Sequence, residues 1–431
     1  MYATHLLSLL AAAAAAATAQ EYPLANGCSG GEATQQGGNY YCREVQHIQY
    51  RGFAGRGSYD EVVDMPANGS CSFRAREFQG SLAPLDEDLS VHVRGPVHLK
   101  AAAVYTLTQA QPQDQQNHLR IKRHPRLRHP EWVTAVIDGQ TVSWVNNWFG
   151  PTPVPDSDSD SVPAPPPDPT LPVEETTTTT VTKTMTITPL PAPKETGGAV
   201  WRRVAHYDAE SQSVDNMRFL GNYGGQQSGV WSEQYGNSLA YLSADGHSGS
   251  ASPEILQDKA LPSNHEFAIF SAEKCDESCG FSRAQNVSYK GFGGANKIFL
   301  LRFSMPSDGD GNDMPAIWLL NGRIPRTVQY GDCSCWSTRC GEVDVFEALE
   351  TGGTKCKSTF HLSRRGGSSD WFKRPTDRYI TVAVIFHHDT ASVTIKILPD
   401  YDDFAESIDD FTVHDWMDGG EESTLFEFNG S

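Results

Sequence analysis

Residues Gly341-Glu-Val-Asp-Val-Phe-Glu347 place three carboxylates within one short apolar and β-branched run. In an extended strand Glu342 and Asp344 share one face, and the two valines share the other. Glu347 breaks this alternation, because a regular strand would turn its carboxylate into the core at a cost of several kcal/mol. One extra residue, a bulge at Val345-Phe346, returns it to the face of the other two acids. The stretch therefore predicts a bulged strand that presents three acids on one face.

The sequence on both sides of this stretch is also typical of strands. Four further runs of strand length are rich in β-branched and aromatic residues and are bounded by Gly, Pro, Asp or Asn: 297–303, 315–320, 379–386 and 391–398. No segment of convincing length has the helical period. The sequence therefore predicts an all-β fold, a β-sandwich or jelly roll of the concanavalin-like kind.

Three acids in a row suit glycoside hydrolysis with retention of configuration. One ionised carboxylate attacks the anomeric carbon and a second, protonated one serves the leaving oxygen, with the two groups about 5–5.5 Å apart. Crowding of like charges raises the pKa of one acid and keeps a proton available. Asp344 lies between the other two and can hydrogen-bond the nucleophile. The alternatives are an acidic edge strand or a calcium site.

The acidic stretch resembles the signature of glycoside hydrolase family 16, the laminarinase-like β-jelly rolls, which reads E-[ILV]-D-[IVAF]-[VILMF]-E. Met314-Pro-Ala-Ile-Trp-Leu-Leu320 is similar to the W-P-A-x-W-L-L strand of that family, with Met314 in place of the first Trp. Phe360-His361 resembles the histidine-bearing strand that follows the site. The loop 331–340 departs from the family by being longer and rich in cysteine, so the length of substrate that the cleft accepts stays open.

The resemblance implies roles for individual residues. Glu342 would be the nucleophile, Glu347 the acid/base and Asp344 the assisting acid. Trp318 and Trp336 would be walls on which sugars stack, and His361 a weaker candidate for the site. Trp318 could equally be a core residue. No cofactor or metal is expected.

The whole chain resembles the fungal Target-of-SBF cell-wall proteins, which are regarded as candidate endo-β-1,3-glucanases. The expected organisation is a signal peptide (1–19), a Gly/Tyr-rich N-terminal accessory domain (20–149), a Pro/Thr-rich linker (150–198), a catalytic β-sandwich (199–400) and an acidic tail (401–431). The resemblance rests on 78–90 and on Arg94-Gly-Pro96 in the N-terminal domain, and on the plan of the chain.

Length, charge and the N-terminus agree with a secreted protein of two domains. The chain has 431 residues, more than one core usually organises. Its net charge of −19 argues against nucleic acid as a partner, and most of that charge lies in 151–200 and 401–431, which predicts a solvated linker and tail. Leu6 to Ala17 is an apolar run that ends in a small-x-small pattern, and it is too short to cross a membrane. No membrane partner is expected.

The nine cysteines predict disulfides in an oxidising compartment. Six lie in the second half of the chain and can pair internally, whereas three lie in the first half, so one is left free or crosses over. We expect at least one bridge to anchor the loop before Glu342. A zinc site at Cys333, Cys335 and Cys340 is the alternative. Asn68 and Asn286 begin glycosylation sequons.

The N-terminal domain has no chemistry that the residues reveal. Runs 90–94 and 141–145 read as strands. Trp132, Trp144 and Trp148 are either a sugar-binding platform of an accessory module or ordinary core aromatics. Lys122-Arg123 is a possible dibasic processing site.

Three functions remain open at this point. The first is a secreted, monomeric, retaining hydrolase whose partner is the β-glucan of the fungal cell wall, with endo-β-1,3 specificity. The second is a cell-wall transglycosylase that uses the same carboxylates. The third is a non-catalytic wall carbohydrate-binding protein, and the intact acid triplet argues against it. The first two share a glycosyl-enzyme intermediate, so the sequence does not separate them.

Overall fold

The computed structural model describes residue 28 and residues 33–108, 132–137, 140–145, 199–420 and 422–428. Two compact units are present, one made of 1–110 together with 196–431 and the other of 111–195. In the second unit the described residues form one antiparallel hairpin, β8 (Trp132–Ile137) and β9 (Gln140–Val145). The expected signal peptide, the Pro/Thr-rich linker and Lys122-Arg123 lie outside the described residues.

The first unit is built on two nine-stranded sheets. The first sheet runs in the order β11 (Ser213–Asp215), β10 (Val200–Asp208), β7 (His98–Thr108), β18 (Lys297–Ser304), β23 (Ile380–His387), β24 (Ser392–Leu398), β3 (His47–Arg51) and β26 (Ser423–Glu427), with β25 (Ser407–Asp409) paired to β10. The second sheet runs in the order β16 (Gly249–Ser250), β15 (Ala240–Leu242), β12 (Met217–Gly221), β17 (Glu266–Ser271), β6 (Leu89–Arg94), β19 (Ala316–Asn321), β20 (Glu342–Ala348), β21 (Lys355–Phe360) and β22 (Phe372–Lys373).

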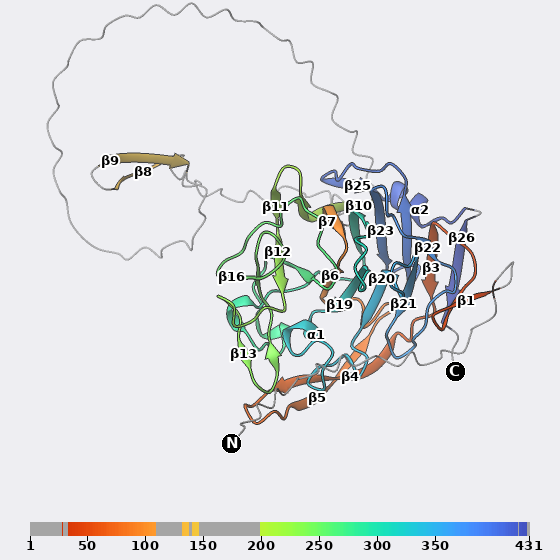
Figure 1. Ribbon diagram of the computed structural model, residues 1–431, viewed down its shortest axis with the longest axis horizontal. Coiled ribbons are helices and arrows are strands. Elements are labelled where there is room, and N and C mark those ends of the chain that lie inside the picture. The colour runs from red at the N-terminus through yellow and green to blue at the C-terminus, as the bar shows by residue number, and fades with distance from the viewer. Residues whose placement is uncertain are drawn as a thin grey trace, which may run out of the picture. The chain divides into compact units, whose positions relative to one another are not determined.

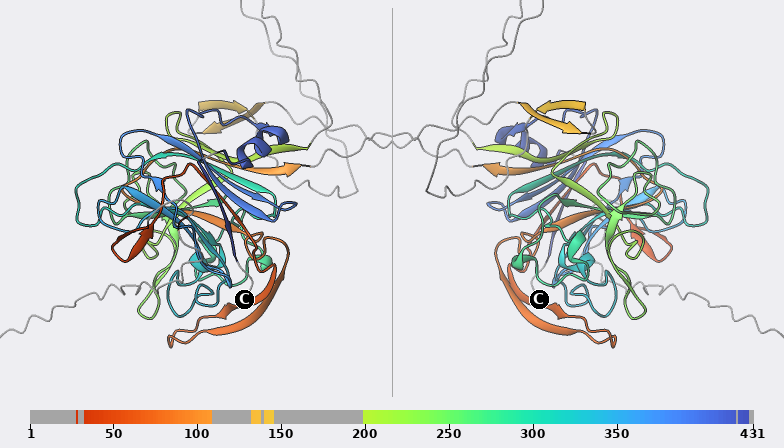
Figure 2. Two further views of the ribbon diagram at one scale, coloured as in Figure 1. Left: turned by 90° about the vertical axis from the view of Figure 1, so that its right-hand side faces the viewer. Right: turned by 90° about the vertical axis from the view of Figure 1, so that its left-hand side faces the viewer.

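Short elements surround the sheets. They are the hairpins β1 (Thr34–Gln36) with β2 (Asn39–Tyr41), β4 (Arg56–Asp64) with β5 (Ser72–Gln79), and β13 (Trp231–Ser232) with β14 (Gly236–Asn237), the 3-10 turns η1 (Glu277–Cys279) and η2 (Gln285–Val287), and the helices α1 (Arg323–Arg326) and α2 (Asp410–Met417). The β4–β5 hairpin extends as a curved orange arm along the lower edge of the sheets (Figure 2). Among the described residues no helix is both long enough and apolar enough to span a bilayer.

The two sheets pack face to face over one hydrophobic core. Ile48, Phe299 and Val384 of the first sheet belong to the same buried cluster as Val91 and Ile317 of the second. Each of these strands alternates between this core and an outer face, as half-buried strands do. The predicted all-β character and the predicted strand runs are confirmed, and the arrangement is a β-sandwich.

The separate N-terminal domain expected from the sequence is not what the structure contains. Strand β6 lies between β17 and β19 in the second sheet. Strand β7 lies between β10 and β18 in the first, and β3 lies between β24 and β26 (Figure 1). Strands β3, β6 and β7 therefore complete the same sandwich as the strands after the linker. The physical reason is that 89–94 and 98–108 are too apolar to be edge strands and too few to bury their faces on their own.

The expected acidic tail is also wrong for the described residues beyond 400. Strand β25 pairs with β10, and β26 pairs in parallel with β3. Asp409 caps the N-terminus of helix α2, because its carboxylate accepts from the Thr412 amide at 2.9 Å. The inward face of the helix buries Val413 and Trp416. The acidic side chains around this helix are its solvated surface, while the apolar residues between them hold it to the sheet.

Residues 199–431 expressed alone should not fold. The fragment lacks β3, β6 and β7, so both sheets are interrupted and six strand edges are left unpaired. We expect insoluble protein, or soluble protein without a cooperative thermal transition by circular dichroism. The matched control replaces 111–195 by a short turn and should stay folded, because Thr108 and Val200 are already paired as neighbours in β7 and β10. A soluble, cooperatively melting 199–431 fragment would contradict the shared core.

Candidate active site

The predicted bulge in β20 is confirmed by the pairing with both neighbouring strands. Opposite β19, Ala316 pairs with Glu347 and Trp318 with Asp344, so one extra residue lies on β20 between the two pairs. Opposite β21 the register shifts between Asp344 and Glu347 as well. Paired residues in an antiparallel ladder share a face. The bulge thus keeps Glu342, Asp344 and Glu347 on the outer face while the apolar residues between them fill the core.

Glu342, the first residue of β20, lies beneath two aromatic side chains on this face. It is 6% exposed, and its carboxylate accepts hydrogen bonds from the Trp336 indole N–H and, at 3.3 Å, from the Tyr330 hydroxyl. The two rings meet edge to face with their centroids 5.5 Å apart. Both donors therefore come from the loop between α1 and β20 and fix one carboxylate in place.

Disulfides hold that loop, as the sequence predicted. Cys335 pairs with Cys340 inside it, and Cys333 pairs with Cys71 of the β4–β5 hairpin. The remaining bridges are Cys28–Cys42 and Cys275–Cys279, and Cys356 is a buried free thiol. The proposed zinc ligands are thus used in disulfides, and no group of three or more His, Cys, Asp or Glu side chains that could hold a metal occurs among the described residues.

Asp344 and Glu347 each have a basic partner of their own. The His361 imidazole Nε2 lies 3.0 Å from the Asp344 carboxylate, which is almost fully buried. The Arg94 guanidinium donates to Glu347 Oε1 at 3.2 Å, and its Nε also donates to the Met314 carbonyl at 2.9 Å. Glu347 is the most accessible of the three acids, with a side chain that is 25% exposed.

Trp318 is packed rather than open. It is 3% exposed and stacks on His92 with ring centroids 5.3 Å apart, and its indole N–H is buried without a partner in the described part of the chain. Its neighbours form a second apolar cluster on the outer face of the second sheet. Of the two sequence interpretations, the core residue fits this position. Trp336 is partly exposed and its ring lies 6.1 Å from that of His361.

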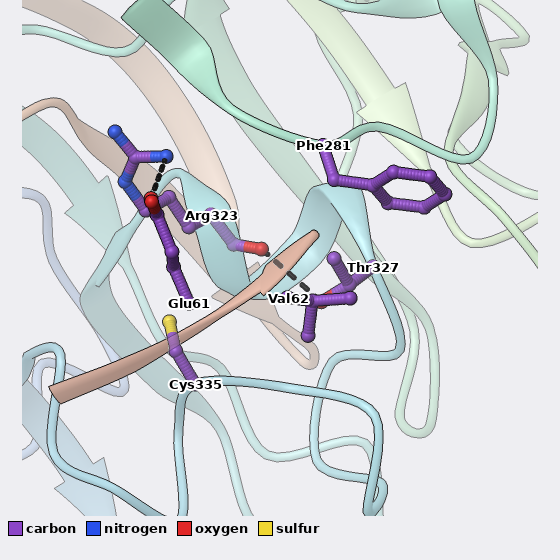
Figure 3. Close-up of a pocket in the computed structure, with 6 residues that line it drawn as sticks. All are labelled: Glu61, Val62, Phe281, Arg323, Thr327 and Cys335. Atoms are coloured by element: carbon purple, nitrogen blue, oxygen red, sulfur yellow. Dashed lines mark hydrogen bonds and ion pairs between the residues drawn. The ribbon is translucent and has the colours of Figure 1, made fainter. Parts of the chain in front are cut away.

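A pocket beside the loop shows how the hairpin is attached to the site. Figure 3 shows Glu61 of β4 and Arg323 of α1 pointing toward each other, and their charged atoms are 2.9 Å apart. The pocket is too small to hold a water molecule, so it is a packing gap. The same charge network includes a second ion pair, in which Arg76 Nε lies 3.1 Å from Glu87 Oε1. This network and Cys71–Cys333 secure the hairpin over the loop that carries Trp336.

Burial dominates the electrostatics of the acids. Burial, and after it repulsion from Asp344, raises the pKa of Glu342 to about 8, while His361 and the Trp336 N–H oppose the shift. Burial also raises the pKa of Asp344 well above its usual value, with Glu347 adding to the shift and Arg94 opposing it. The sequence argument expected crowding to protonate one acid. In the structure, burial is the larger cause, and the raised pKa values fall on Glu342 and Asp344.

The comparisons with known proteins agree with this architecture. Family profiles described as "Cell wall protein YJL171C/Tos1" match residues 46–107 with their N-terminal part and 199–416 with their C-terminal part. The chain belongs to the YJL171C/Tos1 cell wall protein family. Both matched segments supply strands to the same sandwich.

Curated relatives extend over nearly the whole chain. One from Candida albicans, named "Probable circularly permuted 1,3-beta-glucanase TOS1", is 38% identical over 89% of this chain and 92% of its own length. One of the same name from Saccharomyces cerevisiae is 40% identical over 90% and 93%. One from Arthroderma benhamiae, named "Probable circularly permuted 1,3-beta-glucanase", is 36% identical over 93% and 94%. No solved structure matches the chain significantly.

Sequence reasoning missed the part of the site that β6 supplies. Arg94, His92 and Ser90 alternate with valines, so they lie on the acid-bearing face. The Ser90 hydroxyl lies 2.9 Å from His92 Nε2, and His92 Nδ1 lies 3.3 Å from the Glu266 carboxylate. The Glu266 carboxylate also accepts a hydrogen bond from the Gln329 amide at 2.8 Å. The polar alternation in 90–94 was a signal for an outward face. Nothing local indicated that this face would meet Glu347.

The pH profile should report the raised pKa of Glu342. The sequence predicts Glu342 as the nucleophile, which attacks in its ionised form, and that form increases as the pH rises toward about 8. On an aryl β-glucoside with a good leaving group, kcat/KM should therefore climb about tenfold per pH unit below this value. Asp344→Asn removes the repulsion that is the second cause of the raised pKa of Glu342. The rise of kcat/KM should therefore move to lower pH but stay above pH 4.5, because Glu342 remains buried. If kcat/KM instead rises around pH 4.5, and Asp344→Asn does not move this rise, the assignment is contradicted.

Proposed function

We propose that this chain is a secreted, retaining β-1,3-glucanase of the cell wall, with Glu342 as nucleophile, Glu347 as acid/base and Asp344 as the assisting acid. The observation that carries the proposal is the bulge in β20, which brings three carboxylates onto one face and gives each a different set of partners. The name of the relatives, 1,3-beta-glucanase, supports a β-1,3-glucan as the substrate. A resemblance of 342–347 to family 16 signatures supports retention.

The partners of each acid suit a separate step. Glu342 attacks the anomeric carbon to form a glycosyl-enzyme, and Glu347 donates a proton to the departing oxygen. Water then attacks the anomeric carbon with Glu347 as base, which releases Glu342. Trp336 and Tyr330 orient the Glu342 carboxylate. Arg94 donates to Oε1 of Glu347, and within the described residues Oε2 has no partner and can serve the leaving group.

The names of the relatives support a permuted order of strands in this chain. Thr108 of β7 and Val200 of β10 are paired neighbours in the first sheet, although more than ninety residues separate them in sequence. A tight hairpin could join them directly. We propose that 111–195 stands where such a hairpin connection would be, and that this chain shares the permuted order named in its relatives.

Product analysis tests the function and separates the alternatives. The full chain is incubated with a β-1,3-glucan and a labelled acceptor oligosaccharide, with Glu342→Gln as the inactive control. The proposal expects shorter unlabelled sugars and no growth of the acceptor. Redistribution of label into longer chains would instead show a transglycosylase, and unchanged polymer would show a non-catalytic wall protein.

A further inference from the structure

A fourth carboxylate lies on the acid-bearing face of the second sheet. Glu266 of β17 pairs with Arg94 of β6. Arg94 pairs with Ala316 of β19, which in turn pairs with Glu347 of β20. Because paired residues share a face, Glu266 and Glu347 point to the same side of the sheet, three strand spacings or about 14 Å apart along it. The side chain of Glu266 is 34% exposed, so a ligand on this face can reach it.

Two donors hold one oxygen of Glu266 in place. Its Oε1 accepts a hydrogen bond from the Gln329 amide at 2.8 Å, and His92 Nδ1 lies 3.3 Å from the same oxygen. A carboxylate can only accept, so His92 Nδ1 carries a hydrogen. The other ring nitrogen, Nε2, lies 2.9 Å from the hydroxyl of Ser90, and both His92 and Ser90 are buried. Hydrogen bonds from behind fix the direction of a functional side chain in this way.

The second oxygen of Glu266, Oε2, has no protein partner among the described residues. Its Cα partner Arg94 is the cation on the next strand, but the guanidinium of Arg94 is used elsewhere. It donates to Glu347 and to the Met314 carbonyl, and it lies over the Trp318 ring, 5.8 Å from the ring centroid. Glu266 therefore presents a fixed and accessible hydrogen-bond acceptor on the same face as the three acids.

An exposed aromatic ring connects Glu266 to the proposed nucleophile. Gln329 and Tyr330 are consecutive, and Gln329 donates to Glu266 while the Tyr330 hydroxyl donates to Glu342 at 3.3 Å. Burial of this hydroxyl, and after it the charges of Glu342 and Glu266, raises the pKa of Tyr330 well above its usual value. The residue as a whole is nevertheless 48% exposed, so its ring is open to solvent beside the buried hydroxyl.

The surroundings of Oε2 indicate which ligand chemistry fits. The ligand has to donate a hydrogen, because a carboxylate oxygen only accepts. A cation would meet the guanidinium of Arg94 on the neighbouring strand, and an anion would be repelled by Glu266 itself. A neutral hydroxyl group can donate to Oε2, and the C–H face of a sugar can pack on the exposed ring of Tyr330. These features together favour a neutral saccharide.

We propose that Glu266 and Tyr330 form a further sugar subsite, in which one unit of a neutral polysaccharide donates a hydroxyl hydrogen to Glu266 Oε2 and packs on the Tyr330 ring. The three strand spacings to Glu347 exceed one sugar ring, so this unit is not the one that reacts. The subsite stabilises a chain that extends across the sheet, which favours cleavage within a chain. The choice of β-1,3-glucan as that chain rests on the proposed function, whereas the subsite does not.

The test measures binding with the full chain in a Glu342→Gln background, so that no probe is consumed. Glu266→Ala removes the acceptor, whereas Glu266→Gln keeps an amide oxygen for His92 and Gln329 and places an NH₂ group where Oε2 was. Glu273→Ala, which removes an exposed carboxylate outside the site, is the matched control. Isothermal titration uses β-1,3-linked gluco-oligosaccharides of increasing length, then manno- and chito-oligosaccharides of the same lengths. Thermal melting shows whether each variant is folded.

We expect Glu266→Ala to weaken the binding of long oligosaccharides by about 10–100-fold, the usual range for loss of a hydrogen bond to a charged group, and Glu266→Gln to weaken it by less. The loss should grow with chain length, because a disaccharide held at the acids does not extend to Oε2. Glu273→Ala should bind like the parent. With Glu342 restored, Glu266→Ala should raise KM for polysaccharide more than it lowers kcat.

The outcomes separate this inference from the proposed function. Binding that depends on Glu266 and on chain length, in a protein that cleaves no glucan, would support the subsite and count against the glucanase assignment. The same dependence with a manno- or chito-oligosaccharide alone would support the subsite and change the sugar. A parent that binds none of these chains, or folded Glu266 variants that bind every length like the parent or lose the same factor at every length, would overturn the proposal.

Discussion

Glu342→Ala should reduce the cleavage of every β-glucan substrate to background, a loss on the order of 10⁴-fold or more. In the proposed mechanism this carboxylate, held by Trp336 and Tyr330, forms the glycosyl-enzyme. The loss should be equal on polysaccharide and on aryl glycosides, because the nucleophile is needed whatever the leaving group. The initial rate of reducing-sugar release measures activity on polysaccharide, and the initial rate of phenolate release measures activity on aryl glycosides.

Two controls separate chemistry from folding. Glu342→Gln keeps the shape of the side chain, and its amide can still accept from Trp336 and donate to Tyr330. It should melt as a folded protein yet be as inactive as the alanine variant. Glu273→Ala removes an exposed carboxylate outside the site and should keep full activity. Near wild-type rates for Glu342→Ala would end the assignment of the nucleophile.

Glu347→Ala should separate the two kinds of substrate. On polysaccharide the departing alkoxide needs a proton, so the rate should fall by about 10²–10⁴-fold. On an aryl glycoside the phenolate leaves without a proton, so the first step should be much less affected, and the slow second step should accumulate glycosyl-enzyme. Burst kinetics with an aryl glycoside would show this accumulation.

Arg94→Met is the matched companion of this variant. It removes the guanidinium that holds Glu347 but leaves the acid in place, so it should produce a smaller loss on polysaccharide than Glu347→Ala. The partly exposed position of Arg94 makes an effect on folding small. Equal losses of Glu347→Ala on both substrates would assign the proton transfer to another group.

Local pattern was enough to predict the bulged strand β20. The alternation of 342–347 fails at one residue, and the cost of burying a carboxylate leaves a bulge as the physical solution, which the pairing of β20 confirms. The same argument identified β18, β23 and β24, since apolar runs of that length and composition have few other ways to be buried.

Long-range pairing was beyond local pattern. A Pro/Thr-rich stretch between 150 and 198 suggested two domains, yet β6 and β7 are central strands of the shared sandwich, and only the full set of strands determines that arrangement. The hydrogen bond from Arg94 to Glu347 and the disulfide between Cys71 and Cys333 both depend on this arrangement, so local pattern could not predict them. Helix α2 was missed because its few buried residues lie among acidic ones.

Trapping the glycosyl-enzyme tests the central claim most directly. A 2-deoxy-2-fluoro β-1,3-linked glucoside with an activated leaving group slows the second step more than the first, so the intermediate persists and can be located by mass spectrometry of the digested protein. The account predicts a glycosyl adduct on the peptide that contains Glu342, at that residue, and no adduct in Glu342→Gln. An adduct on a different carboxylate, or products of inverted anomeric configuration with no adduct, would contradict it.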